Sequence, residues 1–356
     1  MLLRNTVRTP KQYHVKGKLI FGILFLIIIS LFTIYVSINV GPYEISKGET
    51  FNFFLNYLGF ENHLISDTQI AIIQTVRLPR ILMAFIVGGG LSVSGVIMQA
   101  LFRNNLADPS IIGVSAGGAT GAVFAIFTGI AVLSVWAIPF FAFLGSFIAL
   151  FLVFGISSFA GRISVPTLIL SGIAIGAFLN SITSAIILFS GDIESQRQMI
   201  FWLAGGFDTA RWAGLKFIAP IVIIPSIISL IFARDLNILM IGEDQAESLG
   251  IRVQFTRNFL LIIASIITSV SVAYTGVIAF VGLIIPHIVR LVIGADNRIL
   301  IPFTFFSGSI FVLFSDTLAR TIISPAEIRV GLITSFLGAP FFIYLLITNR
   351  KNFYSL

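Results

Sequence analysis

The chain has 356 residues, of which 57% are hydrophobic and only 10% charged, and its formal net charge is +7. A soluble domain carries roughly 25% charged residues, so this composition excludes an ordinary soluble protein. The basic residues are scattered singly, which argues against nucleic-acid binding. The chain has no cysteine, so thiol catalysis, disulfides and cysteine-ligated metals are excluded.

Long uncharged runs predict helices that cross a membrane. Residues 20–40 contain no charge, and about 20 apolar residues span a bilayer. The basic N-terminus resembles the opening of a signal peptide, but this run is too long and lacks a small-residue cleavage site, so we expect a retained helix. Divisions at Pro, Gly and charges predict ten spans. They are 18–39, 80–102, 111–130, 135–158, 165–189, 215–233, 256–275, 277–294, 300–320 and 328–348.

The lysines and arginines predict the orientation of these spans. With ten crossings both termini share one side, which receives fourteen basic residues against eight on the other. Basic residues favour the cytoplasmic side. We therefore expect a cytoplasmic segment 1–17, one ten-helix domain over 18–349, and a cytoplasmic tail 350–356.

Two apolar runs, 81–102 and 111 onward, flank a polar elbow at 103–109. Small residues recur at helical spacing in both runs. Small residues on one face let membrane helices approach closely. The pattern predicts that these two helices pack tightly against each other. The small residues are Gly90, Ser94, Gly113, Gly117 and Gly121.

Three segments outside the spans are long enough to hold structure. The outer loop 40–76 contains a short amphipathic stretch, Phe51–Leu58. The outer loop 190–214 mixes charges with Trp202 and Trp212, a pattern typical of an interfacial helix. The third segment is the inner loop 234–255.

Residues 242–250 of that inner loop, GEDQAESLG, predict a short capped helix. Its first turn is acidic, which the helix dipole favours, and Gly250 suits the position after the helix that needs a positive φ. Ala246 and Leu249 are three apart and share a face. Two interpretations remain open, a solvated loop helix and a helix that binds another protein.

The sequence offers little for catalysis. No cluster of His, Glu and Asp has the spacing of a metal site or a catalytic triad. The phosphate-binding loop GxxxxGK(S/T) needs Ser or Thr after its lysine. Here Gly17-Lys18 is followed by Leu19, so the chain lacks this loop. His287 and Arg290 predict a hydrogen-bonded helix-packing pair. We therefore expect a non-catalytic chain without a metal site.

Charges at the span ends allow two interpretations. Asp316 and Arg320 are four apart in the order that favours a helical ion pair. Intramembrane acids also mark proton pathways, but a carboxylate already paired with an arginine favours a structural role. Arg77 and Arg80 either extend to the membrane surface or, with Arg320, bind carboxylates of an extracellular partner.

Four stretches together resemble the FecCD family, the permeases of type II ABC importers for iron siderophores, haem and vitamin B12. The resemblance runs in order through residues 75–351. The stretches are RLPRILMAFIVGGGLSVSGVIMQALFRNNLADPSIIGVSAGG at 77–118, GEDQAESLGI at 242–251, FVGLIIPHIVRLVIGADNRILIP at 280–302 and EIRVGLITSFLGAPFFIYLL at 327–346.

The resemblance implies an all-α membrane protein with ten transmembrane helices in a bacterial plasma membrane. It implies three partners besides lipid: a second permease subunit (identical or paralogous), a cytoplasmic ABC ATPase dimer, and an extracytoplasmic substrate-binding protein. ATP and Mg²⁺ would bind the ATPase, and this chain would hold no cofactor and bind no nucleic acid.

The resemblance also implies sites. The ATPase-coupling residues, within 235–255, would be Gly242, Glu243, Asp244, Ala246, Glu247, Leu249 and Gly250. Arg77, Arg80 and Arg320 would dock the binding protein. Asn104, Asn105 and Leu106, with Ser164 and Val165, would form the cytoplasmic gate.

One departure concerns the gate, since the family usually has proline where this chain has Asn105. A proline would fix φ and remove an N–H, so we expect a less rigid turn. Candidates for lining the path are Met98, Gln99, Asn180, Ser181 and Ser184.

The resemblance implies import of a metal chelate, and we expect a ferric siderophore, with haem and cobalamin as alternatives in the same family. An ion-coupled secondary transporter is the alternative from another class. A membrane enzyme is disfavoured because nucleophiles, bases and metal ligands are not clustered.

Overall fold

The computed structural model describes residues 12–43, 45–60, 65–159 and 164–348, and all regular structure within them is helical. Within the described residues, seven helices are long and apolar enough to cross a membrane, and three shorter apolar helices accompany them. These ten lie at the ten predicted spans, which confirms the all-α membrane fold. They are α1 (Gln12–Asn39), α4 (Leu78–Leu101), α5 (Val114–Phe127), α6 (Ala137–Phe159), α7 (Val165–Phe189), α9 (Trp212–Ile231), α12 (Val253–Thr275), α13 (Val281–Ile293), α14 (Asn297–Ala319) and α15 (Val330–Thr348).

The boundaries differ from the predicted spans mainly at the start of the chain. The first helix begins at Gln12, so residues 12–17 of the predicted N-terminal segment belong to it. Residues 1–11 and the predicted tail 350–356 lie outside the described residues. The division of the chain into a segment, a domain and a tail therefore stays a prediction.

Shorter helices connect these ten. The helix predicted in the outer loop 190–214 is confirmed as α8, and α2 covers most of the amphipathic stretch 51–58. The connecting helices are α2 (Lys47–Tyr57), α3 (Asp67–Ala71), the π-helix η1 (Ile72–Arg77), the 3₁₀-helices η2 (Pro109–Ile112) and η3 (Ile130–Val132), α8 (Ile193–Leu203), α10 (Ala233–Ile241) and α11 (Glu243–Ser248).

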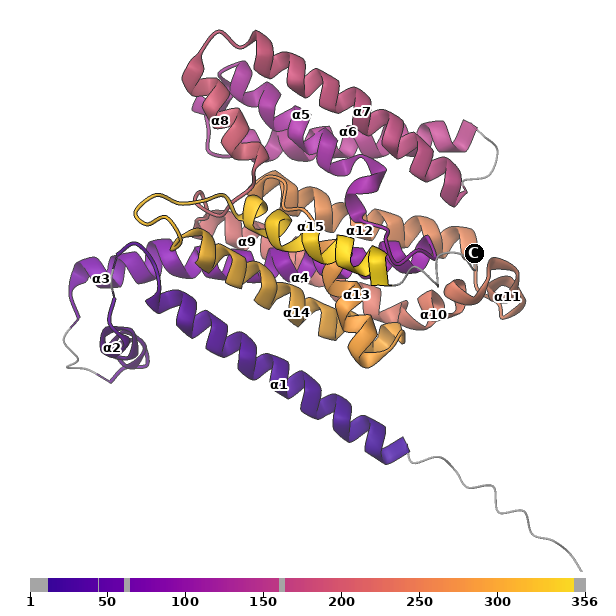
Figure 1. The fold of residues 1–356 in the computed structure, drawn as a ribbon, viewed down its shortest axis with the longest axis horizontal. Coiled ribbons are helices and arrows are strands. Elements are labelled where there is room, and N and C mark those ends of the chain that lie inside the picture. The colour runs from indigo at the N-terminus through magenta and orange to yellow at the C-terminus, as the bar shows by residue number, and fades with distance from the viewer. Residues whose placement is uncertain (1–11, 44, 61–64, 160–163, 349–356) are drawn as a thin grey trace, which may run out of the picture.

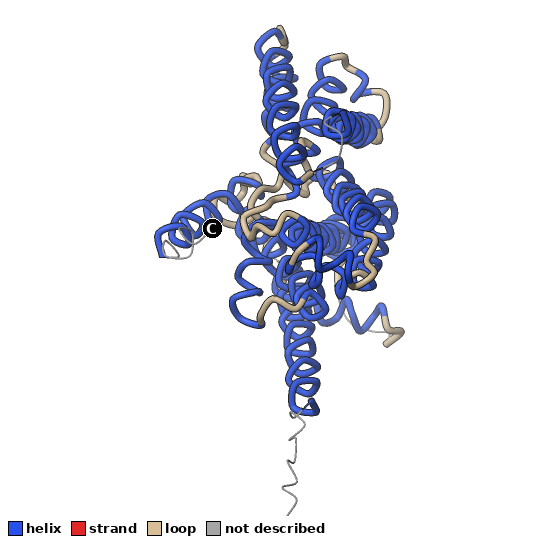
Figure 2. The backbone as a smooth tube through the Cα atoms, turned by 90° about the vertical axis from the view of Figure 1, so that its right-hand side faces the viewer, coloured by secondary structure: helices blue, strands red, loops and turns tan. Residues whose placement is uncertain are grey.

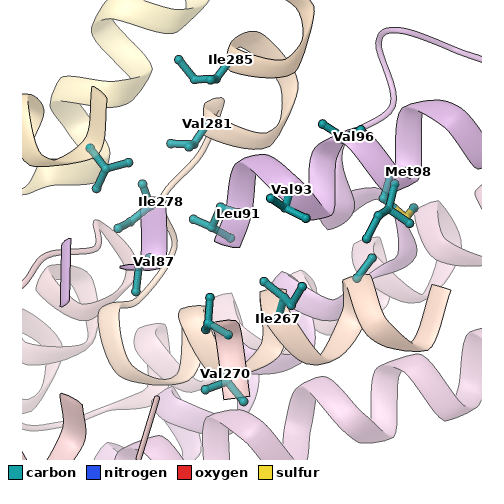
Figure 3. Close-up of a cluster of buried hydrophobic side chains, with 14 of the residues drawn as sticks. Val87, Leu91, Val93, Val96, Met98, Ile267, Val270, Ile278, Val281 and Ile285 are labelled. Carbon is teal, nitrogen blue, oxygen red and sulfur yellow. The ribbon is translucent and has the colours of Figure 1, made fainter. Parts of the chain in front are cut away.

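The fold is organised around α4, whose side chains are almost all buried. This helix packs against α9, α12, α13 and α14. Its apolar side chains, such as Leu91 and Val93, lie between Ile267 of α12 and Val281 of α13 (Figure 3). Helices α5 to α8 form a layer on one side of this core, and α1 lies on the opposite side (Figures 1 and 2).

The prediction that the helices on either side of the elbow pack against each other is wrong. Their small residues serve other contacts. A Cβ on Gly88 of α4 would lie 2.5 Å from the carbonyl oxygen of Gly308 in α14, and one on Gly117 of α5 would lie 2.3 Å from that of Gly145 in α6. The helix α12 packs against both α4 and α5. The elbow therefore carries the chain from the core to another layer.

Residues 276–280, between α12 and α13, are not helical although they lie inside the protein. Gly276 and Phe280 both have φ of +70°. The N–H of Gly206 donates to the carbonyl of Thr275 (2.7 Å), and a Cβ on Gly331 would lie 2.7 Å from the carbonyl oxygen of Val277. Irregular backbone at membrane depth must be covered by protein or line a water-filled cavity. Here glycines of two other segments cover it.

Candidate functional site

The predicted coupling helix is present as α11 and has the predicted C-terminal cap. Gly250 has φ of +83°. Its N–H donates to the carbonyl of Glu247 (2.9 Å), and the N–H of Ile251 donates to that of Ala246 (3.0 Å). These two bonds form a Schellman motif, which ends a helix sharply at a glycine. The capped helix over 242–250 is therefore confirmed, and its role in coupling stays a prediction.

Ala246 of α11 and Leu249, which caps this helix, do not face the same surroundings. Ala246 is fully buried, because its side of α11 packs against the rest of the protein. Leu249, in contrast, is 66% exposed. A surface of three acids and two apolar side chains remains open to solvent. We call this the coupling surface, and it consists of Ile241, Glu243, Asp244, Glu247 and Leu249.

Glu243 makes two ion pairs that the sequence did not predict. Its Oε2 lies 2.5 Å from Nη2 of Arg257 in α12, and its Oε1 lies 3.5 Å from Nη2 of Arg103 in the elbow. The sequence offered only one indication of these pairs, the opposite charges of the groups. The predicted orientation places both arginines and the acidic helix on the cytoplasmic side of the membrane. Sequence spacing does not show which basic residue an acid will meet across helices.

The elbow after α4 is a hydrogen-bonded turn although it lacks the proline. Asn104 N–H donates to the carbonyl of Gln99 (3.1 Å), and Arg103 N–H donates to that of Ala100 (3.3 Å). The side-chain oxygen of Asn104 then accepts the N–H of Leu106 (2.9 Å). Asn105 is exposed at the tip. These bonds supply local order that the sequence-based expectation of a looser turn did not include.

The second predicted gate segment lies at the start of α7. Ser164 is its N-cap and accepts the N–H of Thr167 (3.3 Å), whose hydroxyl accepts the N–H of Ser164 in return (3.1 Å). Val165 is the first helical residue. Residues 160–163 of the same turn lie outside the described residues. The start of α7, the end of α4 and α11 all lie at one end of the molecule (Figure 1).

The predicted path-lining residues fall into two separate groups. Met98 and Gln99 are fully buried in α4, where Gln99 Nε2 donates to the carbonyl of Leu283 (3.0 Å). The other three are exposed on α7, in the outer layer of helices. The chain does not bring the two groups together. The exposed three are Asn180, Ser181 and Ser184.

The three predicted docking arginines lie together at the opposite end, but they are buried. Arg77, Arg80 and Arg320 are 4%, 8% and 3% exposed. The predicted helical ion pair between Asp316 and Arg320 is confirmed, with Nε 3.1 Å from Oδ2. The buried carboxylate of Asp316 also binds Arg80 at 2.9 Å, a contact that the sequence did not predict.

The remaining contacts of these arginines join several segments. Arg80 Nη1 lies 2.8 Å from Oε2 of Glu327. Arg77 donates to the carbonyls of Ile38 and Tyr43, and Arg320 donates to that of Val40 (3.1 Å). The guanidinium groups therefore hold the end of α1 against α4 and α14.

Comparisons with known proteins identify the family of this chain. The family model described as the FecCD transport family matches residues 26–348. The chain belongs to the FecCD transport family. It is therefore a multi-pass permease of a type II ABC importer, a class in which a separate subunit uses ATP.

Relatives of this FecCD permease differ in the cargo for which they are named. The cobalamin import system permease protein BtuC of Halobacterium salinarum is 42% identical over 79% of this chain and 75% of its own. The hemin transport system permease protein HmuU of Yersinia pestis is 36% identical over 95% and 98%. The iron(3+)-hydroxamate import system permease protein FhuG of Bacillus subtilis is 35% identical over 93% and 97%.

A solved structure also matches this FecCD permease. It is described as an inward-facing metal-chelate type ABC transporter, and it superposes with a TM-score of 0.80 at 33% identity. The match covers 92% of this chain and 98% of the other.

Two neighbouring cavities open at the end that holds the buried arginines. One has a volume of 280 Å³ and the other 470 Å³, and both are lined by Trp202, Asp208 and Tyr274. Arg329 lies over the Phe201 ring at 4.7 Å and pairs with Asp208. Among the described residues, no group of three or more His, Asp or Glu side chains is placed to hold a metal.

Proposed function

We propose that this FecCD permease imports a metal chelate, with ferric siderophores as the first candidate and haem and cobalamin as alternatives. The relatives named for cobalamin, hemin and ferric hydroxamate support the cargo class. The sequence identities of these three relatives to this chain are too similar to rank the three cargoes. Uptake of labelled ferric hydroxamate, haem and cobalamin by a deletion strain carrying this permease tests the choice.

The observation that carries the proposal is the coupling surface. Its three acids are solvent-exposed on the short helix α11, and its two apolar side chains are exposed just before and just after that helix, outside the predicted spans. Ile241 and Leu249 are 70% and 66% exposed. Exposed apolar groups rimmed by charge favour a protein partner. We assign that partner as a cytoplasmic ATPase dimer, which binds ATP and Mg²⁺, so both termini are cytoplasmic.

The test reverses charge on the coupling surface without breaking the chain's own ion pairs. Asp244 and Glu247 are exposed and form no ion pair among the described residues. The double variant Asp244→Lys, Glu247→Lys should lose the ATPase on copurification and lose uptake, yet insert normally. The control is Glu194→Lys on α8, at the other end, which breaks only an exposed ion pair with Arg197. A double variant with normal uptake, or uptake driven by an ion gradient without ATP, would contradict the proposal and favour a secondary transporter.

The buried arginine cluster supports a docking site for the binding protein at the opposite end. Its guanidinium groups already bind carboxylates of this chain, among which Glu327 is one-third exposed. A carboxylate of the binding protein can compete at Glu327 because that contact lies nearest to solvent. Glu327→Gln should then strengthen docking of the binding protein. Weaker docking would contradict this assignment of Arg77, Arg80 and Arg320.

For the gate, we propose that the elbow at Asn104–Leu106 and the start of α7 at Ser164 and Val165 close the path on the coupling side. Both lie at the same end as α11 (Figure 1). The exposed residues of α7 support a path shared with a second permease subunit, identical or paralogous. Cysteine pairs at Asn180 or Ser184 should crosslink between subunits. Failure to crosslink in the assembled transporter would remove α7 from the path.

A further inference from the structure

A chain of charges joins the coupling surface to the elbow and to α12. The two carboxylate oxygens of Glu243 face different arginines, one on each side. The Arg257 pair is 2.5 Å long and the Arg103 pair is 3.5 Å. One side chain of the coupling helix therefore contacts both the elbow, at the residue before Asn104, and a helix of the core.

Arg103 has a backbone conformation that arginine disfavours. Its φ is +48°, and it occupies the position after α4 where a Schellman motif prefers glycine. A Cβ crowds the backbone in this left-handed region. Residues held in such conformations concentrate at functional sites. Here the side chain at this position is the one that reaches Glu243.

The two arginines that pair with Glu243 differ in solvent exposure. The Arg257 side chain is 6% exposed, whereas the side chains of Arg103 and Glu243 are 40% and 46% exposed. Arg257 lies near the start of α12, which packs against α4, α5, α6 and α9. Arg103 directly precedes Asn104, the first residue of the proposed gate. The two pairs of Glu243 therefore connect α11 both to a buried side chain of the core and to the residue next to the proposed gate.

We propose that Glu243 is a positioning residue that transmits movement of the coupling helix to the elbow through Arg103 and to α12 through Arg257. This inference rests on the proposed coupling to an ATPase and names the contact through which that coupling reaches the gate. Without the contact, ATP hydrolysis moves the gate less effectively. The quantity that changes is the amount of cargo moved for each ATP hydrolysed.

The experiment uses the complete transporter in liposomes, with its ATPase, its binding protein and the labelled chelate that the wild type takes up. Arg103→Gln should lower the ratio of cargo moved to ATP hydrolysed by about 5- to 10-fold, a typical coupling between two sites. Glu243→Gln should lower it at least as much, because this change also removes the pair with Arg257. The double variant should be no worse than Glu243→Gln alone, because Arg103 acts through Glu243. Arg103→Lys should restore most of the ratio because it keeps the charge.

The matched control is Arg234→Gln. Arg234 is also exposed at this end of the molecule, and no ion pair is found for it among the described residues. Its variant should keep the wild-type ratio. Arg103→Gly provides a second test, because glycine suits the backbone there. It should keep or raise the thermal midpoint in detergent while lowering the ratio.

Three results would overturn the inference. They are an unchanged ratio in Arg103→Gln, an equal fall in Arg234→Gln, and additive losses in the double variant. Cargo uptake by the wild type without ATP would overturn the proposed function together with this inference. An ATP-driven wild type whose Arg103→Gln variant keeps its ratio would overturn the inference alone.

Discussion

Arg80 binds Asp316 through two nitrogen atoms across 236 positions of the sequence, with Nε 3.0 Å and Nη2 2.9 Å from Oδ1. The same carboxylate accepts Arg320 at 3.1 Å and is fully buried. One acid thus holds an arginine of α4 and an arginine at the end of α14 together. The buried carboxylate of Asp316 stabilises the packing of α4 against α14 only while it stays paired with both arginines.

Asp316→Asn should therefore destabilise the protein strongly. Removing one partner of a buried ion pair costs roughly 3–5 kcal/mol, because the remaining charge is left uncompensated. Here two buried arginines would lose their shared partner. Unfolding in detergent, followed by circular dichroism, measures the loss. The matched control Glu194→Gln breaks an exposed pair with Arg197 (3.8 Å) and should cost less than about 1 kcal/mol. Equal losses would show that Asp316 contributes no more than a surface charge.

The close approach of α4 and α13 gives a second prediction. A Cβ on Gly95 would lie 1.9 Å from the backbone oxygen of Gly282. Gly95→Ala should cost about 1–3 kcal/mol because the two helices must separate. A Cβ on Gly155 in α6 would meet no heavy atom of another segment within 4 Å, so Gly155→Ala should be neutral or stabilising by up to about 1 kcal/mol. Thermal melting of both variants in detergent compares them, and a stable Gly95→Ala variant would contradict the packing.

The cap of α2 predicts a pH dependence outside the membrane spans. The N–H of Ser46 and the side chain of Gln69 both donate to Glu49, and these bonds lower the pKa of its carboxyl below 4.5. Because the folded pKa is depressed, the cap is fully formed above the ordinary value and is lost as the pH falls through the lowered one. Carboxyl chemical shifts in a specifically labelled sample should give a midpoint below 4.5. A Gln69→Ala variant removes one of the two donors and should raise that midpoint, and an unchanged midpoint would contradict the role of the Gln69 bond.

Leu249→Asp tests the apolar part of the coupling surface. Leu249 is 66% exposed, so the change should alter the stability of this chain by less than about 0.5 kcal/mol. It should nevertheless reduce copurification of the ATPase, because the substitution puts a charge into a protein contact. Val132→Asp is the matched control, since Val132 is 89% exposed in the 3₁₀-helix η3 at the other end. Equal ATPase recovery from the two variants would place the contact elsewhere.

The sequence predicted most of the helices because each one satisfies its own backbone within an uncharged run. The ten spans, the capped helix ending at Gly250 and the Asp316–Arg320 pair all follow from spacing within one segment. Contacts between segments were harder to predict. Small residues at helical spacing show that Gly117 has a close neighbour, but they do not show that this neighbour is Gly145.

The same limit explains what was missed in the candidate sites. The acids of 243–247 were visible, but their arginine partners lie in two other segments. The arginines predicted to dock a partner do lie together, but their burial depends on Asp316, Glu327 and the end of α1. A sequence gives the charges of these groups, and only the fold shows which of them are already paired.

The covered stretch at 276–280 has a consequence for the order of biosynthesis. Its neighbours include Gly331, which the ribosome adds more than a whole helix later, and whose N–H donates to the carbonyl of Gly205 (3.4 Å). Bare peptide groups are costly in lipid, so this region cannot reach its final form while the C-terminal part is still being made. The nascent chain must wait beside the insertion machinery, or be shielded by another protein, until α15 arrives.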